Sequence, residues 1–328
     1  MSEDTELPST ALARAEFSQA VRKRSADLAL RGLALAEKLG PAETAFAQRR
    51  RTLRFPEDRS IGRVYIRDYI PSASEAEQPT STSFNRFNRE IVTVDARGIV
   101  DVPAGKIAEL GISEACADLS PLLKLRADDL HTLTMTGKRV TDMGLVHVRN
   151  LTGLRSLTLT NAPITGTGLA CFENLRNLKL LHLYGTNVTD DALAYLEDLT
   201  RLQWLDLNST PLMGTGLVHL QKLTSLRELS LDYTHVDDAS LVHIRRLTNL
   251  WFLYLDGTRV GDPGLTHLRR LRQLRILGLS HTKVTDDGLL HLRALTSLRS
   301  IFLSGTQTTE SGRRDLRHHL PLWKSQEA

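Results

Sequence analysis

Cysteine is scarce in this sequence. Its 328 residues include two cysteines, Cys116 and Cys171, which lie far apart. Two distant thiols cannot provide the repeated spacing of a disulfide framework or of a zinc knuckle. The scarcity therefore favours a reducing compartment.

Long apolar runs and a secretory leader are also missing. No apolar stretch approaches the ~18 residues that a membrane-spanning helix needs. The first residues, MSEDTELPSTALARAEFSQA, begin acidic and lack the charged-then-apolar order of a signal peptide. We therefore predict a cytoplasmic protein without a membrane span.

Aromatic residues and net charge are both low. Aromatics make up 5% of the residues, whereas 41% are hydrophobic, so the core is expected to be aliphatic. The formal net charge of +4 is small for a chain of this length. It does not by itself indicate a nucleic-acid partner, because the distribution of charge matters more than its sum.

The dominant feature that is present is an internal repeat. Leucines recur every 24 residues and begin eight consecutive units, which we number as repeats 1 to 8: Leu130, Leu154, Leu178, Leu202, Leu226, Leu250, Leu274 and Leu298. Within a unit, apolar residues occupy positions one, four, six, eleven, sixteen, nineteen and twenty-two. A shortened copy precedes repeat 1, between Ile107 and Leu125. A fixed period of this length is typical of a solenoid.

The apolar spacing changes within each unit. Its first part reads Leu-x-Leu, which has the period of a strand, and its last part reads Leu-x-x-Ile-x-x-Leu, which has helical spacing. One unit cannot bury its apolar side alone, but stacked units can. Strands stack ~4.8 Å apart and helices need ~8–10 Å, so the stack must curve with its strands inside. We predict an α/β solenoid with a parallel β-sheet on the concave face and helices on the convex face.

A consensus can be written for these units: LxxLxLxGTxVTDxGLxxLxxL. It is nearly complete in LKLLHLYGTNVTDDALAYLEDL and LRILGLSHTKVTDDGLLHLRAL. The pattern resembles the leucine-rich repeat family in its ribonuclease-inhibitor-like horseshoe form, and is most similar to bacterial arrays of this GT–V–TD–GL variant. The resemblance covers roughly residues 107–320. It implies the fold and says little about function.

The ninth position departs from that family pattern, because threonine replaces the usual asparagine or cysteine. The hydroxyl of threonine can bond nearby backbone. We therefore predict a ladder in which these side chains bond the turns: Thr186, Thr210, Thr234, Thr258, Thr282 and Thr306.

Aspartates recur at position thirteen, three residues before the helical leucine. An N-cap is expected there, with the carboxylate accepting bonds from free N–H groups of the helix. The predicted N-caps are Asp142, Asp190, Asp238, Asp262 and Asp286. Repeats 2 and 4 lack this aspartate, and Thr167 and Thr215 are the predicted caps there.

Two sets of basic residues fall on the predicted helices. Histidines occupy position eighteen in five repeats, where we expect a solvated convex face: His147, His219, His243, His267 and His291. Helices ~8–10 Å apart cannot bring such imidazoles to the ~2 Å that zinc requires. Arginines form a second convex strip: Arg245, Arg246, Arg269, Arg270 and Arg293. We interpret this strip as a solubilising surface, and attraction to an acidic partner, nucleic acid or anionic membrane is the alternative.

The candidate binding site lies on the strands. Their outward positions three, five and seven are small in repeats 1 and 2 but aromatic and acidic in repeats 3 to 6. We call the following residues, with the flanking Tyr233, the concave strip: Leu180, His182, Tyr184, Trp204, Asp206, Asn208, Glu228, Asp232, Tyr233, Phe252, Tyr254 and Asp256. Tyrosine and tryptophan are favoured binding anchors. The predicted partner is a protein or peptide with apolar and basic groups, and the acids make nucleic acid unsuitable there.

The ends differ from the array. We predict an N-terminal helical segment over 1–58, with its helix at 9–39, and a strand-rich cap over 59–106 that contains a flexible loop at 70–83. The array itself is assigned to 107–307, about eight full repeats plus a degenerate first one. A C-terminal cap is predicted over 308–328, where Leu320, Leu322 and Trp323 seal the last repeat.

These features favour a non-catalytic scaffold that binds a protein through the concave strip. The sequence contains no glycine-rich phosphate loop, nucleophile elbow or clustered metal motif, so we predict no enzyme activity, no metal and no cofactor. An alternative is an adaptor whose array selects a substrate while the N-terminal region recruits another protein, as in ubiquitin-ligase adaptors. The sequence does not indicate the oligomeric state.

Overall fold

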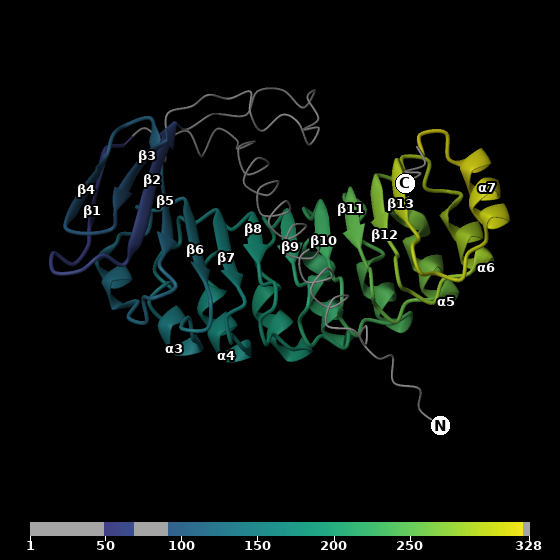
Figure 1. Cartoon of the computed structure of the whole chain (residues 1–328), viewed down its shortest axis with the longest axis horizontal. Helices are drawn as coiled ribbons and strands as arrows, with labels where there is room; N and C mark the ends of the chain where they lie inside the picture. The colour runs from purple at the N-terminus through teal and green to yellow at the C-terminus, as the bar shows by residue number, and fades with distance from the viewer. Residues whose placement is uncertain (1–48, 69–90, 324–328) are drawn as a thin grey trace, which may run out of the picture.

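The structure is a computed structural model that describes residues 49–68 and 91–323. The predicted helix at 9–39 and the predicted loop at 70–83 lie outside these residues. Figure 1 shows the repeats side by side, with their strands in one row and their helices along the opposite side.

The strands of the repeats form one long sheet. The members contributed by repeats 1 to 8 are β6 (Thr132–Thr136), β7 (Ser156–Thr160), β8 (Leu180–His182), β9 (Trp204–Asp206), β10 (Glu228–Ser230), β11 (Phe252–Tyr254), β12 (Ile276–Gly278) and β13 (Ser300–Phe302). Together with β5 (Lys106–Ile112) they are parallel and follow one another in sequence order. The register repeats as well, since Leu205 pairs with Leu181 on one side and Leu229 on the other.

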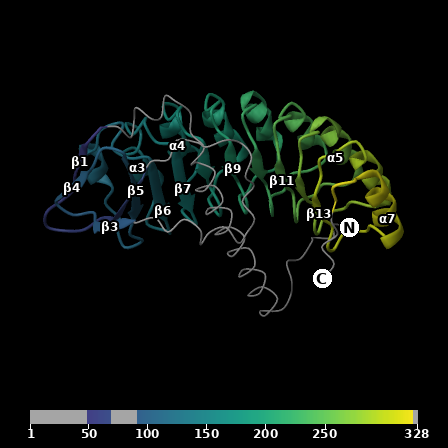
Figure 2. The same ribbon diagram turned by 90° about the horizontal axis from the view of Figure 1, so that it is seen from above.

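Helices on the opposite side are short. Four are single α-helical turns: α3 (Asp142–Leu145), α4 (Gly166–Leu169), α5 (Asp262–Leu265) and α6 (Asp286–Leu289). The others are 3₁₀ helices: η3 (Ala170–Phe172), η4 (Asp190–Leu196), η5 (Thr215–Lys222), η6 (Ala239–Ile244), η7 (Thr266–Arg270) and η8 (Leu290–Leu292). Figure 2 shows the resulting arc, with the strands on its inner side. The predicted horseshoe is confirmed.

The core is a continuous aliphatic column. The leucines at positions one, four and six are buried in successive repeats, as Leu226, Leu229 and Leu231 illustrate with no exposed surface. One connected cluster extends from Leu53 to Leu320. Because each repeat contacts mainly its neighbours, this column holds the array together.

The N-terminal cap is made of antiparallel strands. Strand β2 (Gly62–Asp68) pairs with β5 over seven residues and carries β3 (Val92–Asp95) at the sheet edge. Strands β1 (Arg51–Arg54) and β4 (Ile99–Val102) form a separate pair. The assignment of 1–58 to a helical segment is therefore wrong for 51–54, where alternating burial of Arg51 and Leu53 fits a strand.

The C-terminal end is closed by α7 (Glu310–His319). It lies where the preceding repeats have their short helices, but it is a longer α-helix. Thr309 caps it by accepting a bond from the Gly312 N–H. Leu316 and Leu320 are buried against the last repeat, but Leu322 is 47% exposed and does not seal the end as predicted. A 3₁₀ helix near the other end, η2 (Ser120–Lys124), occupies the corresponding place in the degenerate first unit.

Candidate functional site

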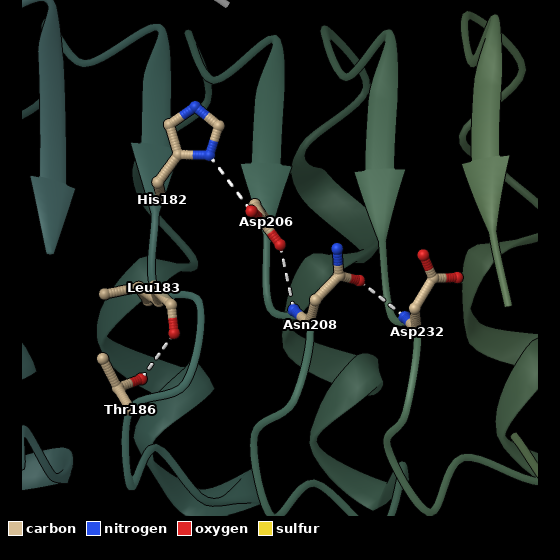
Figure 3. A network of polar contacts seen from close by, with 6 residues as sticks. All are labelled: His182, Leu183, Thr186, Asp206, Asn208 and Asp232. Atoms are coloured by element: carbon tan, nitrogen blue, oxygen red, sulfur yellow. Dashed lines mark hydrogen bonds and ion pairs between the residues drawn. The ribbon is translucent and has the colours of Figure 1, made fainter. Parts of the chain in front are cut away.

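The threonines at position nine bond the turns as predicted. In each of repeats 3 to 8 the hydroxyl donates to the carbonyl oxygen three residues earlier, at 2.6 to 2.8 Å. Thr186, for example, donates to Leu183 at the end of β8, as Figure 3 shows. These hydroxyls therefore stabilise the turn that follows each strand.

The aspartates at position thirteen do not cap their own helices. Thr141 is the N-cap of α3, and the Asp142 carboxylate instead accepts bonds from the N–H and hydroxyl of Thr165, one repeat further along. Asp190 likewise accepts from Gly214 and Gly216. The prediction is therefore wrong about which helix each aspartate bonds. In the stacked repeats the turn of the next repeat lies within reach of the carboxylate.

The two threonine caps proposed for repeats 2 and 4 are also wrong. Thr165 caps α4, and its hydroxyl accepts from the Thr167 N–H at 3.3 Å. In repeat 4, Gly214 holds the cap position, and Asp190 of the preceding repeat bonds the Gly216 N–H. The turns are thus linked across repeats.

This link explains the glycine of the repeat signature, which the sequence alone did not. A Cβ on Gly264 would lie 2.4 Å from the Asp238 carboxylate, and one on Gly288 would lie 2.2 Å from Asp262. Only glycine leaves room for the aspartate of the preceding repeat. Where position thirteen is itself glycine, position fifteen of the next repeat holds a larger residue. Gly166 is followed in the next repeat by Ala192, and Gly214 is followed by Ser240.

Three of the five convex histidines contact the preceding repeat. His219 Nδ1 lies 3.3 Å from Glu197 Oε2, and His243 Nδ1 lies 3.0 Å from Gln221 Nε2. His291 Nδ1 contacts the guanidinium of Arg269. They are half-buried, where an open solvated face was predicted. Among residues 49–68 and 91–323, no three His, Cys, Asp or Glu side chains are grouped as metal ligands.

The convex arginines are mostly exposed. Arg245, Arg246, Arg269 and Arg270 have open side chains, whereas Arg293 pairs with Asp315 at 2.5 Å. The strip is therefore partly neutralised at its C-terminal end.

The concave strip is brought together by the strand register. Position three aligns Leu180, Trp204, Glu228 and Phe252 across β8 to β11. Position five aligns His182 and Asp206 with Ser230 and Tyr254 in the same way. Position seven continues the pattern with Tyr184, Asn208, Asp232 and Asp256. Eleven of the twelve predicted residues thus form adjacent rows on the inner face of four repeats, and the twelfth, Tyr233, follows the third row.

Polar members of the strip form a ladder that sequence reasoning missed. His182 Nδ1 lies 3.2 Å from Asp206 Oδ2, and the other oxygen of Asp206 accepts from the Asn208 N–H. Asn208 Oδ1 in turn accepts from the Asp232 N–H at 2.6 Å, as Figure 3 shows. In the next repeat, Asp232 Oδ1 accepts from the Asp256 N–H at 2.7 Å. These side chains satisfy backbone donors just beyond the strands, so they are fixed in orientation.

The strip is more buried than an open binding face. Nine of its residues are buried, and Tyr184, Tyr233 and Phe252 are partly exposed. Leu180 and Trp204 pack together in an apolar cluster separate from the main core. Three buried polar atoms on neighbouring strands have no hydrogen-bond partner among the described residues: His182 Nε2, Trp204 Nε1 and Ser230 Oγ.

Tyr233 occupies an unusual backbone position. Its φ of 57° is left-handed, and the equivalent residue of the next repeat is Gly257, with φ of 67°. Bulky side chains rarely adopt this conformation. The tyrosine ring covers Gly257, whose Cβ would lie 2.5 Å from the ring. The strained residue lies at the edge of the concave strip.

Comparison with known proteins identifies the class. The profile described as leucine-rich repeat region matches residues 153–322, which is more than half of the chain. The chain belongs to the leucine-rich repeat family. Proteins of this family commonly mediate protein–protein interaction, typically without catalysis, through the extended concave surface of the solenoid.

Solved structures agree with this assignment. Internalin InlF from Listeria monocytogenes is similar, with a TM-score of 0.56, 26% identity and 65% of this chain covered. Internalin C2 from the same organism has a TM-score of 0.50, 26% identity and 58% of this chain covered. This chain spans 58% of the length of the first and 78% of the second. No curated protein matches the sequence.

Within 49–68 and 91–323, no helix combines the length and apolar character that crossing a bilayer requires.

Proposed function

We propose that the protein is a non-catalytic scaffold that binds a protein or peptide through the concave strip of repeats 3 to 6. The strip is the part of the inner face where aromatic, acidic and apolar side chains are aligned across four strands. Its polar groups are spread along rows and do not converge on one reacting atom, which catalysis would require.

The observation that supports this most is the set of unsatisfied polar atoms. His182 Nε2, Trp204 Nε1 and Ser230 Oγ lie on the adjacent strands β8, β9 and β10 and have no partner in the described structure. Buried polar atoms are nearly always hydrogen-bonded, and each exception costs stability. A polypeptide lying across these strands could provide hydrogen-bond donors and acceptors to all three atoms, because they lie on adjacent strands.

The charge of the strip defines the partner further. Asp232 and Asp256 each accept a hydrogen bond from a backbone N–H of the next repeat. Together with Trp204 and Tyr254, they favour a partner that presents basic and apolar groups. Cytoplasmic location, bacterial origin and an adaptor role for the N-terminal region remain predictions.

A matched pair of variants tests the proposal in the full chain. Trp204→Ala/Tyr254→Ala removes two aromatic residues of the strip, and Trp323→Ala/Tyr195→Ala removes the same residue types from the C-terminal cap and the convex side. Proteins captured from the native cells by the parent chain are compared with those captured by each variant, after circular dichroism has shown both to be folded.

We expect the first variant to lose the captured partner and the second to retain it. Equal retention by both variants would refute binding through the strip. Equal loss would also refute it, because binding by two folded variants would then not depend specifically on the strip.

A further inference from the structure

Basic and aromatic side chains alternate just before the strands, at position two of repeats 5 to 7. The guanidinium carbon of Arg227 lies 4.4 Å from the centre of the Trp251 ring, and that of Arg275 lies 4.3 Å from it. Arg299 follows in the next repeat. We call Arg227, Trp251 and Arg275 the arginine–tryptophan stack.

Neither Arg227 nor Arg275 is neutralised by an acid of the described residues. Within residues 49–68 and 91–323, neither Arg227 nor Arg275 forms an ion pair. Burial lowers the pKa of Arg275, and the neighbouring Arg299 and Arg227 lower it further. By contrast, Arg176 and Arg293 on the convex side each pair with an aspartate. Like charges held together in this way are unfavourable unless an anion joins them.

The stack is also held rigidly. The Trp251 indole N–H donates to Gln273 Oε1 at 3.2 Å, and the Gln273 amide contacts Asn249. Backbone bonds connect the same residues, since the N–H of Trp251 donates to Arg227 and that of Arg275 donates to Trp251, each at 2.7 Å. A guanidinium stacked by its face retains N–H donors along its edge, in the geometry that a carboxylate accepts.

We propose that the arginine–tryptophan stack is a second binding site, which accepts the carboxylates of an acidic peptide segment. Arg227 and Arg275 are two repeats apart, about 10 Å at the usual strand spacing, which suits neighbouring acidic side chains of one extended segment. Asp232 and Asp256 at position seven lie beyond the ends of β10 and β11, about 16 Å further along at the usual rise of an extended chain. A long polyanion such as nucleic acid would reach these aspartates and be repelled, whereas a short acidic segment would stay clear of them. Glu228, the acid next to Arg227 in the sequence, is buried.

This site is independent of the proposed function of the concave strip. The stack lies at the opposite end of the strands from Asp232 and Asp256, and its ligand has the opposite charge. A partner that used both sites would present an acidic segment on one side and basic groups on the other.

Binding of a fluorescein-labelled oligoglutamate peptide to the full chain tests the site. The variant Arg227→Gln/Arg275→Gln removes both stacked charges while keeping most of each side chain. Arg245→Gln/Arg246→Gln is the matched control, because it removes the same charge from exposed convex positions. Trp251→Leu removes the aromatic platform without changing the charge.

We expect the stack variant to weaken peptide binding at least about tenfold, since a charge-assisted hydrogen bond contributes roughly that factor or more. The control should change binding less than about twofold, because salt screens exposed charges. Trp251→Leu should weaken binding, and Trp204→Ala/Tyr254→Ala should leave it unchanged. Equal weakening by the stack variant and the control would overturn the proposal, because it would show general charge attraction. Tighter binding of the same peptide with phosphoserine in place of glutamate would overturn the choice of carboxylate.

Discussion

The threonine ladder shows what one hydroxyl contributes in a repeated turn. Thr258 is buried and donates to the carbonyl of Leu255 at 2.7 Å. Its neighbours Thr234 and Thr282 do the same in their own repeats. The sequence predicted this role correctly because the bond is local and depends only on spacing within one unit.

Replacing Thr258 with valine removes this bond and keeps the shape. We expect Thr258→Val to lower the free energy of unfolding by about 1 kcal/mol, because a buried carbonyl loses its hydroxyl donor. Urea denaturation of the variant and the parent chain measures the change. Thr158→Val serves as the control, because Thr158 is half-buried and its hydroxyl makes no hydrogen bond within the described residues. An unchanged or increased stability of Thr258→Val would contradict a structural role.

His131 gives a prediction about pH. Burial lowers its pKa from the usual 6.5 to about 3, and the cations Arg67, Arg155 and Lys179 add to the effect. Between these values the unfolded chain binds a proton that folded His131 does not. Stability should therefore fall as the pH drops from 6.5 toward 3, by about 2 kcal/mol from this group at about pH 5.

Urea denaturation at about pH 7 and pH 5 measures this contribution. His131→Gln removes the titrating group, so its stability should decline less than that of the parent chain over the same interval. Identical declines in the two proteins would show that His131 is not held neutral by the fold.

At the scale of the repeat, the link between aspartate and glycine determines how adjacent turns fit. Asp142 faces Gly168, and Asp262 faces Gly288, each at a distance that excludes a Cβ. The sequence showed the recurring TD and GL dipeptides but not their pairing, because a strict period does not tell whether a side chain bonds its own turn or the next. The three-residue apolar spacing also predicted helices without distinguishing an α-helical turn from a 3₁₀ helix.

The pairing can be tested by transferring it to repeats that lack it. Gly166→Asp alone places a carboxylate against Ala192, which lies 3.3 Å from the position of the new Cβ. We expect a loss of about 1–3 kcal/mol from this crowding. Adding Ala192→Gly recreates the arrangement of the other repeats and should recover at least about 1 kcal/mol through coupling. Strictly additive effects of the two substitutions on urea denaturation would contradict the pairing.

At the scale of the whole molecule, the array separates its polar residues by surface. The convex side contains paired and exposed cations. The arginine–tryptophan stack lies at the start of the strands, and the polar ladder from His182 to Asp256 lies at their ends. The sequence predicted the arc, the leucine core and which residues share the inner face, because these depend on periodicity. It did not predict the burial of Trp204 and Asp206, since burial depends on side chains from neighbouring strands that lie a full repeat away.

Site-specific photo-crosslinking in the native cells tests the central claim most directly. A benzophenone amino acid is introduced in place of Tyr184 or Phe252 of the concave strip, or in place of Tyr195 on the convex side. The account predicts that one polypeptide is captured from both Tyr184 and Phe252 and is absent from Tyr195. Capture of that polypeptide from Tyr195 alone, or of no polypeptide from either strip position, would contradict it.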